Sequence, residues 1–256
     1  MTKQVLGRMR RLLHQARRWL FRRLGMYRWI GGAGLALQRI SGNAYRYQPR
    51  CGVDDQRAEA VRPTTARWEA IAPHLPTTGS ALDVGCNNGF FTFKLAERGL
   101  LSLGVDTNTN AIATARLLGV RNDPPRAGFA RLDLTPRTAA SLPGVDVVLC
   151  LSVFHHLVRH QGLEDATEVM AVLASKTRRL MVFETGQADE VSKSWWRELA
   201  FMGEDPQGWV GQFLTGLGFE RVQQIASFPG HKNAIERALV VAEKPPLAPE
   251  RRERAG

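Results

Sequence analysis

The chain has 256 residues and a mass of 28.5 kDa, which suits one α/β domain with a terminal extension and excludes two full enzyme domains. Hydrophobic residues make up 44% and charged residues 23%, a balance that excludes wholesale disorder. The longest apolar run near the start, residues 29–37, is too short to span a bilayer. Three scattered cysteines, Cys51, Cys86 and Cys150, argue against a disulfide framework and a Cys-x-x-Cys metal site, so we expect no metal and a reducing cytoplasm.

The net charge of +11 is concentrated at one end of the chain. Residues 1–50 hold 12 Lys and Arg and no acidic residue, and the remaining residues hold 23 basic and 24 acidic groups. We therefore expect a basic arm over residues 1–50 that is separable from the fold, a domain over 51–244 and a disordered tail over 245–256. Any affinity for polyanions belongs to the arm.

Apolar residues in the arm recur at steps of three and four, with arginines between them, which predicts an amphipathic helix with a basic face. Such a helix can lie on an anionic membrane, follow a nucleic-acid backbone or pack on the domain. Trp19, Phe21, Tyr27 and Trp29 cluster near the cations, which favours the membrane. A secretory signal is not expected, since no apolar region of the usual length is present.

The domain alternates short β-rich runs with helical patterns. A helix over 65–74 precedes strands expected at 81–84, 101–105, 128–132, 145–151, 180–183, 219–225 and 238–242. Between them lie helices at 89–98, 108–117, 163–175, 190–201 and 206–217. This order predicts an α/β fold, a doubly wound, seven-stranded and mostly parallel sheet. The connection through Pro229 and Gly230 is too short for a crossover helix, so the last two strands should pair antiparallel at one edge.

A glycine loop follows the first expected strand, in the segment Ala81-Leu-Asp-Val-Gly-Cys-Asn-Asn-Gly-Phe-Phe91. Gly85 and Gly89 let the backbone approach a ligand closely. The dinucleotide fingerprint requires glycine at the position of Asn87 and glycine or alanine at that of Phe90. A nicotinamide cofactor is therefore disfavoured.

The same segment resembles motif I of the class I S-adenosylmethionine-dependent methyltransferases, in which an acidic residue precedes three alternating glycines. Asp83, Gly85 and Gly89 match the motif, and Asn87 replaces its middle glycine, a position where asparagine tolerates positive φ. The cofactor is a sulfonium with an amino-acid tail and no phosphate. A carboxylate at Asp83 near its ammonium group suits it better than a phosphate cradle does.

Further motifs follow in the order of that family, over residues of about 66 to 243. Asp106 ends the second strand, where the family's carboxylate bridges the ribose hydroxyls, and Asp133 falls where the adenine amino group is bound. Residues 144–157 resemble motif IV, below the methyl group. Helix N-caps at Asp83 and Asp106 and an ordinary turn at Asp133 are the alternatives. The resemblance implies these cofactor-binding residues: Asp83, Gly85, Cys86, Asn88, Gly89, Asp106, Asp133, Leu134 and Leu151.

Two histidines follow the fourth strand at the edge of the sheet where open α/β folds bind ligands. Imidazole can act as a base near neutral pH, and we favour His156 over His155 as the group that faces the acceptor. Glu184 ends the fifth strand and either contacts the acceptor, orients His156 or is structural. Trp195, Trp196 and Trp209 are secondary candidates for a substrate cover, since tryptophans on helices more often lie in the core.

The acceptor is expected to be a small molecule or a lipid- or glycan-linked group, methylated on oxygen or nitrogen at the inner membrane face. A narrower resemblance to the transferases that modify the wobble uridine of bacterial tRNA makes RNA the alternative acceptor. The near-neutral domain disfavours RNA, because tRNA recognition needs a basic surface. A protein that binds S-adenosylmethionine without turnover is the third alternative.

Overall fold

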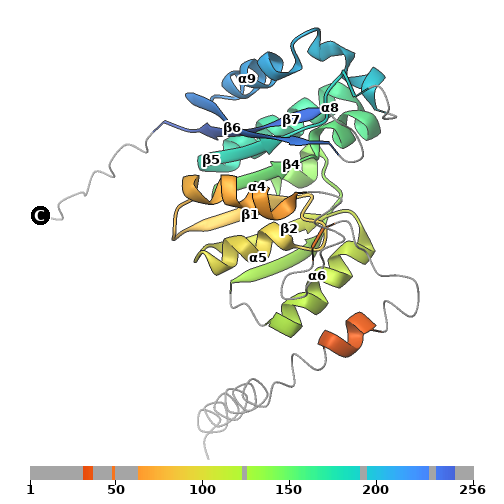
Figure 1. Ribbon diagram of the computed structural model, residues 1–256, viewed down its shortest axis with the longest axis vertical. Coiled ribbons are helices and arrows are strands. Elements are labelled where there is room, and N and C mark those ends of the chain that lie inside the picture. The colour runs from red at the N-terminus through yellow and green to blue at the C-terminus, as the bar shows by residue number, and fades with distance from the viewer. Residues whose placement is uncertain are drawn as a thin grey trace, which may run out of the picture.

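The computed structural model describes residues 31–36, 48–49, 63–122, 126–190, 195–230 and 235–245. Helices and strands alternate along most of this part of the chain (Figure 1). The strands are β1 (Ser80–Val84), β2 (Leu101–Asp106), β3 (Ala127–Arg131), β4 (Val145–Leu151), β5 (Thr177–Glu184), β6 (Arg221–Pro229) and β7 (Glu236–Glu243). The helices are α4 (Thr64–Ile71), η1 (Ala72–His74), α5 (Phe90–Glu97), α6 (Thr109–Asn122), α7 (Pro136–Ala140), α8 (Phe154–Lys176), η2 (Trp196–Met202) and α9 (Pro206–Gly216).

The strands form one seven-stranded sheet in the order β3-β2-β1-β4-β5-β7-β6. The first five strands are parallel, and β7 pairs antiparallel with both β5 and β6. The predicted doubly wound, mostly parallel sheet with an antiparallel edge is therefore confirmed. The strand order reverses between β1 and β4, and ligands of open α/β sheets bind at the carboxyl ends of strands beside such a point.

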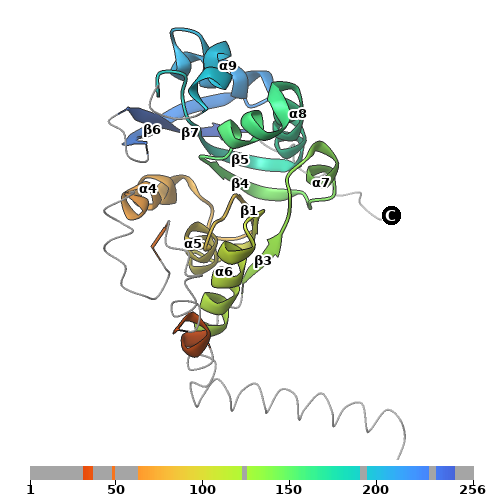
Figure 2. The same cartoon turned by 90° about the vertical axis from the view of Figure 1, so that its right-hand side faces the viewer.

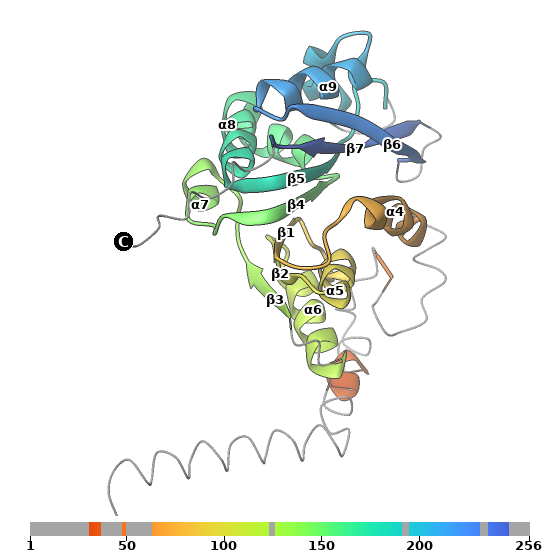
Figure 3. The ribbon, with the colours of Figure 1, turned by 90° about the vertical axis from the view of Figure 1, so that its left-hand side faces the viewer.

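The sheet is covered on both faces, with α4, α5 and α6 on one side and α7, α8 and α9 on the other (Figures 2 and 3). Strand β4 is buried on both faces, because Val148 and Cys150 contact the core under α8 whereas Val147 and Leu149 contact the core under α4 and α5. This explains its continuous apolar run, which is typical of a central parallel strand.

Three elements differ from those predicted. Helix α8 begins at Phe154 and has a non-helical residue, Gly162 with φ of 87°, where two helices meet. The sequence pattern located the second of these helices and missed the first, which carries both histidines. The five-residue helix α7 was not predicted, and the described part of the helix expected at 190–201 is the 3₁₀ helix η2.

Part of the predicted arm packs on the domain. Residues 31–36 are helical, and Leu35, 6% exposed, forms a small core with Phe93 and Leu118. Residues 1–30, and with them the predicted amphipathic helix, lie outside the described residues, as do 246–256 of the predicted tail. In the part of the chain that the structure describes, no helix combines the length and the apolar character needed to cross a membrane.

Candidate active site

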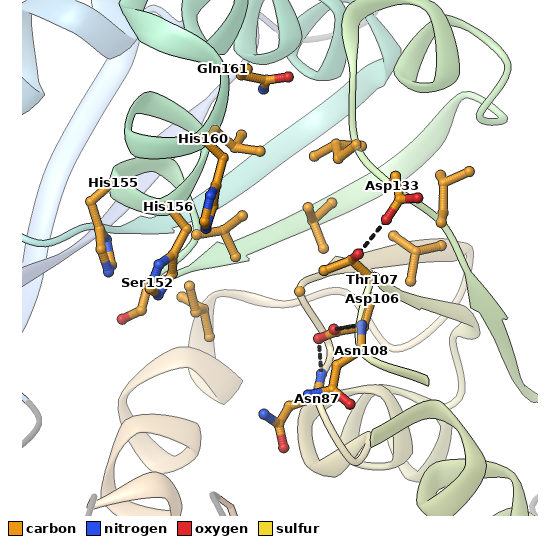
Figure 4. A pocket seen from close by; sticks show the side chains of 18 of the residues that line it. Asn87, Asp106, Thr107, Asn108, Asp133, Ser152, His155, His156, His160 and Gln161 are labelled. Atoms are coloured by element: carbon orange, nitrogen blue, oxygen red, sulfur yellow. Dashed lines mark hydrogen bonds between the residues drawn. The ribbon is translucent and has the colours of Figure 1, made fainter. Parts of the chain in front are cut away.

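A cavity of about 880 Å³ lies at the carboxyl ends of β1, β2 and β4. Figure 4 shows two of its walls. Asn87, Asp106 and Asn108 lie on one side, at the end of β2 and on the loops after β1 and β2, and Ser152 and the histidines of α8 lie opposite. The cavity therefore occupies the position beside the β1–β4 reversal where a ligand is expected.

The loop after β1 adopts left-handed backbone conformations at three positions. Gly85 has φ of 69° and Gly89 has φ of 88°, and a Cβ at Gly85 would collide with the Val153 side chain. Asn87, the residue that replaces the family's middle glycine, has φ of 55°. Because asparagine adopts this conformation at modest cost, the substitution preserves the course of the loop.

Asp106 is held rigidly at the cavity wall. Its Oδ2 accepts a hydrogen bond from the Asn87 backbone N–H and its Oδ1 one from the Asn108 N–H, both at 2.8 Å (Figure 4). Burial raises the pKa of this carboxyl group, while the backbone donors at Asn108 and Asn87 act in the opposite direction. Each oxygen has a further lone pair, so the carboxylate can accept from two neighbouring hydroxyls, as a ribose requires.

Asp133 lies farther along the cavity, and its side chain is exposed. Its Oδ1 accepts from the Thr107 hydroxyl, and its Oδ2 lies 3.7 Å from the guanidinium of Arg131. Leu132, Leu134 and Leu151 line the same region. A carboxylate beside leucine side chains suits a flat base with an exocyclic amino group. The segment is also a turn, because the Asp133 carbonyl accepts from Thr138 at the start of α7.

Asp83 and Cys86 are outside the set of residues that line the cavity. Asp83 is 2% exposed and accepts from the Thr92 hydroxyl at 2.6 Å, and burial raises the pKa of its carboxyl group from 3.8 to about 7. Burial also raises the pKa of the Cys86 thiol. Both side chains therefore support the loop from beneath in this structure.

Asn88 is fully buried and ties the glycine loop to the N-terminal segment. Its Nδ2 donates to the Gln48 backbone carbonyl at 2.8 Å. Gln48 itself lines the cavity. The predicted domain boundary at residue 50 thus cuts through the site, because a residue of the expected arm belongs to the cavity wall.

The two adjacent histidines have different surroundings. His155 is 1% exposed, and its Nδ1 accepts from the Gly186 backbone N–H at 2.9 Å. His156 is exposed and lines the cavity, as does His160 one helical turn later (Figure 4). The Trp195 ring lies 5.4 Å from that of His156 between centroids and 4.7 Å from that of His155. The accessible imidazole is that of His156.

Glu184 is fully buried among cations. It forms ion pairs with Arg67 and with Arg237, and it accepts from the Ser152 hydroxyl. Arg237 in turn donates to both carboxylate oxygens of Glu190, at 2.7 and 2.8 Å. Glu184 is also outside the residues that line the cavity. Of the three roles considered for Glu184, its position supports the structural one, because its partners Arg67, Arg237 and Ser152 line the cavity and the ion pairs hold them in place.

The same network fixes a strained residue of the wall. Ser152 has φ of 61°, its N–H donates to the Glu184 carbonyl at 2.7 Å, and its Oγ accepts from Arg237 at 3.2 Å. A non-glycine residue keeps a left-handed conformation when its neighbours determine it from several sides.

Sequence reasoning missed several lining residues, among them Gln48, Arg67 and Arg237, and it named the tryptophans only as secondary candidates. The two arginines sit in segments far from every motif, and their burial against Glu184 and Glu190 becomes visible once the sheet is assembled. Of the three tryptophans, Trp195 lines the cavity, whereas Trp209 stacks on Phe213 at 4.7 Å in the core under α9.

Residues 82–178 match a family described as a methyltransferase domain. The O-antigen chain terminator bifunctional methyltransferase/kinase WbdD of Escherichia coli is 29% identical over 129 residues, which are 50% of this chain and 18% of that protein. The tRNA U34 carboxymethyltransferase of Ectopseudomonas mendocina is 32% identical over 93 residues, 35% of this chain and 28% of that protein. The chain thus matches less than a third of the length of either relative.

Solved structures share the fold. A crystal structure of WbdD superposes with a TM-score of 0.60 at 24% identity, covering 77% of this chain and 44% of that one. The magnesium protoporphyrin IX methyltransferase from Synechocystis PCC 6803, solved with bound SAH, gives 0.54 at 17% identity over 91% of this chain and all of the other.

The domain is Rossmann-like, and its cavity lies at the β1–β4 reversal, where open α/β folds bind their ligands. Residues 82–178 are thus a methyltransferase domain by the family match, and the chain has the fold of the class I S-adenosylmethionine-dependent methyltransferases.

Proposed function

We propose that this protein transfers the methyl group of S-adenosylmethionine to an oxygen or nitrogen of a small-molecule or glycan- or lipid-linked acceptor. One observation carries the proposal: a single cavity has the Asp106 carboxylate, set for a ribose, on one wall and the His156 imidazole on the opposite wall (Figure 4). A cofactor on the glycine loop and an acceptor beside α8 would thus share one cavity.

The chain's own residues supply position and a proton acceptor. Bound S-adenosylmethionine supplies an electrophilic methyl group. Asp106 and the loop at Gly85 fix the nucleoside, and the strained Ser152 shapes the wall opposite. Holding donor and acceptor in line accounts for most of the acceleration of such a displacement. His156 accepts the proton that an O–H or N–H acceptor loses.

The similarity to an O-antigen chain terminator supports an acceptor at the end of a glycan chain. The basic composition of residues 1–50 supports work at an anionic membrane surface on the cytoplasmic side, where a lipid-linked glycan would be met. A second candidate is a tRNA nucleoside, which the similarity to a tRNA U34 carboxymethyltransferase and the same basic arm both favour.

The test is a labelled-methyl assay with three acceptor preparations: lipid-linked glycans, small polar metabolites and total tRNA. The full-length protein, D106A and H156A are compared. Label in the glycan or metabolite fraction that both substitutions reduce supports the proposal. Label found only in tRNA would instead support the second candidate, a tRNA nucleoside as acceptor. Binding of S-adenosylhomocysteine with no label in any fraction favours the third alternative, a binding protein without turnover.

A further inference from the structure

Gln48 lies far from the sheet in sequence and yet at the glycine loop in space. It is 8% exposed, its backbone carbonyl accepts from Asn88 Nδ2 at 2.8 Å, and the residue lines the cavity together with Gly85 and Asn87. The Gln48 Oε1 atom is buried and has no hydrogen-bond partner among the residues that the structure describes. A buried acceptor without a donor destabilises the fold, so a ligand with an N–H group is expected to meet it.

The carboxylate expected to meet the cofactor's ammonium group is engaged elsewhere. Asp83 is 2% exposed, accepts from Thr92 and is outside the cavity lining. The loop separates two polar sites: the Asn87 N–H faces Asp106 on the ribose side, and the Asn88 side chain faces Gln48. The amino-acid tail of a nucleoside held at Asp106 would cross this loop.

We propose that Gln48 is a cofactor-binding residue whose side-chain carbonyl accepts a hydrogen bond from the α-ammonium group of S-adenosylmethionine. The assignment rests on the proposed function and adds to it a residue from the segment that joins the basic region to the domain. A neutral acceptor there recognises the ammonium group without burying a third carboxylate close to Asp83 and Asp106.

The experiment compares two ligands by calorimetry, S-adenosylhomocysteine and 5′-methylthioadenosine, which lacks the amino-acid tail. In Q48L the affinity for S-adenosylhomocysteine should fall roughly 10- to 100-fold, the range for a hydrogen bond to a charged group, while the affinity for methylthioadenosine stays within about twofold. Q48E keeps the acceptor and should bind S-adenosylhomocysteine within a few-fold of the wild type or more tightly. Q223L, at an exposed position of β6, is the matched control and should change neither affinity.

Three results would overturn the assignment. An unchanged Q48L excludes a contact, and equal losses for both ligands mean that Gln48 only supports the loop through Asn88. A loss in Q48E as large as that in Q48L means that the amide donates to the carboxylate instead. Should the wild type bind neither ligand, the proposed function fails and the assignment fails with it. If Q48L does not fold, the Q48E variant still tests the assignment, because its affinity for S-adenosylhomocysteine is predicted to be retained.

Discussion

The backbone N–H of Gly186 donates to Nδ1 of His155 at 2.9 Å, which joins the loop after β5 to the first turn of α8. An Nδ1 that accepts is unprotonated, so the neutral ring carries its proton on Nε2. The ring is 1% exposed. His155 lines the cavity as well, but its buried ring and engaged Nδ1 support a structural role and leave His156 as the base candidate of the pair.

Replacing His156 with alanine should lower the rate of methyl transfer roughly 10²- to 10⁴-fold, the usual contribution of a general base. The affinity for S-adenosylhomocysteine should stay the same, because His156 lies on the wall opposite Asp106 (Figure 4). Turnover is measured with the acceptor found in the labelling assay, and affinity by calorimetry. Turnover within a few-fold of the wild type would exclude His156 as the base.

His155→Ala is the companion variant and should behave differently. It leaves the Gly186 N–H without its acceptor and opens a void beside Trp195. We expect a loss of about 2–4 kcal/mol in the free energy of unfolding, measured by chemical denaturation. A stable His155→Ala protein would show that the hydrogen bond contributes little.

Asp106→Ala should weaken binding of S-adenosylhomocysteine by about 1–3 kcal/mol, through loss of charged hydrogen bonds to the ribose. Asp165→Ala, at an exposed position in the second half of α8, removes the same charge away from the cavity and should have no effect. Calorimetry that finds the same affinity in D106A as in the wild type would remove Asp106 from the site.

The sequence located the strands of the sheet well, because parallel strands buried on both faces are continuous apolar runs. Strand β4 matches its predicted bounds, residues 145–151. The predicted helices were less accurate than the strands where the sequence shows little helical periodicity. Helix α7 has five residues, too few to show a period, and the first part of α8 was not predicted, since the helical pattern began at residue 163.

In the site, the sequence located residues that lie at strand ends or shortly after them, and Asp106, Asp133, Leu134, Leu151, His155 and His156 all line one cavity. It could not separate lining from supporting residues, since strand-end carboxylates have the same pattern whether they face the cavity, as Asp106 does, or the core, as Asp83 and Glu184 do. Gln48 had no signal, because its contact with Asn88 joins positions 40 residues apart.

Glu190→Ala should destabilise the protein strongly. Its removal leaves the Arg237 guanidinium, 2% exposed, with two of its donors unmatched, and breaking a buried ion pair from one side costs about 3–5 kcal/mol. Glu243→Ala is the control, because its pair with Arg221 is solvent-exposed and should contribute less than about 1 kcal/mol. Equal losses in denaturation of the two variants would contradict this reading of the network.

The stability of the ligand-free protein should fall as pH rises, because of Asp83. Burial raises the pKa of this group from 3.8 to about 7, so the folded state holds a proton that the unfolded state has released between these values. The unfolding free energy contributed by the group therefore declines from about pH 4 to pH 7, by about 4 kcal/mol in total, and stays low above pH 7.

Asp83→Asn removes this titration while keeping an acceptor for Thr92. The variant should match the wild type near pH 4 and be the more stable protein at pH 8, in denaturation measured at both values. A difference between the two proteins that does not change with pH would show that the carboxyl group titrates normally.

Deleting residues 1–30 should abolish binding to anionic vesicles and leave the affinity for S-adenosylhomocysteine unchanged. These residues carry nine of the 12 basic groups of the predicted arm and no acid, and each cation contributes about 1 kcal/mol near an anionic surface. The deletion retains Leu35, which packs on Phe93, and Gln48. Deleting residues 1–50 should weaken S-adenosylhomocysteine binding as well, because it removes Gln48 from the cavity wall.

Membrane binding is measured by co-sedimentation with phosphatidylglycerol vesicles. Vesicles of phosphatidylcholine alone are the control. Binding that persists at high salt would point to insertion of apolar side chains such as Leu12, Leu13 and Trp19, since salt screens only the charged part. An intact protein that ignores anionic vesicles and binds tRNA with a steep salt dependence would refute the membrane assignment. The basic arm would then be an RNA contact, and the tRNA alternative would take the place of the lipid-linked acceptor.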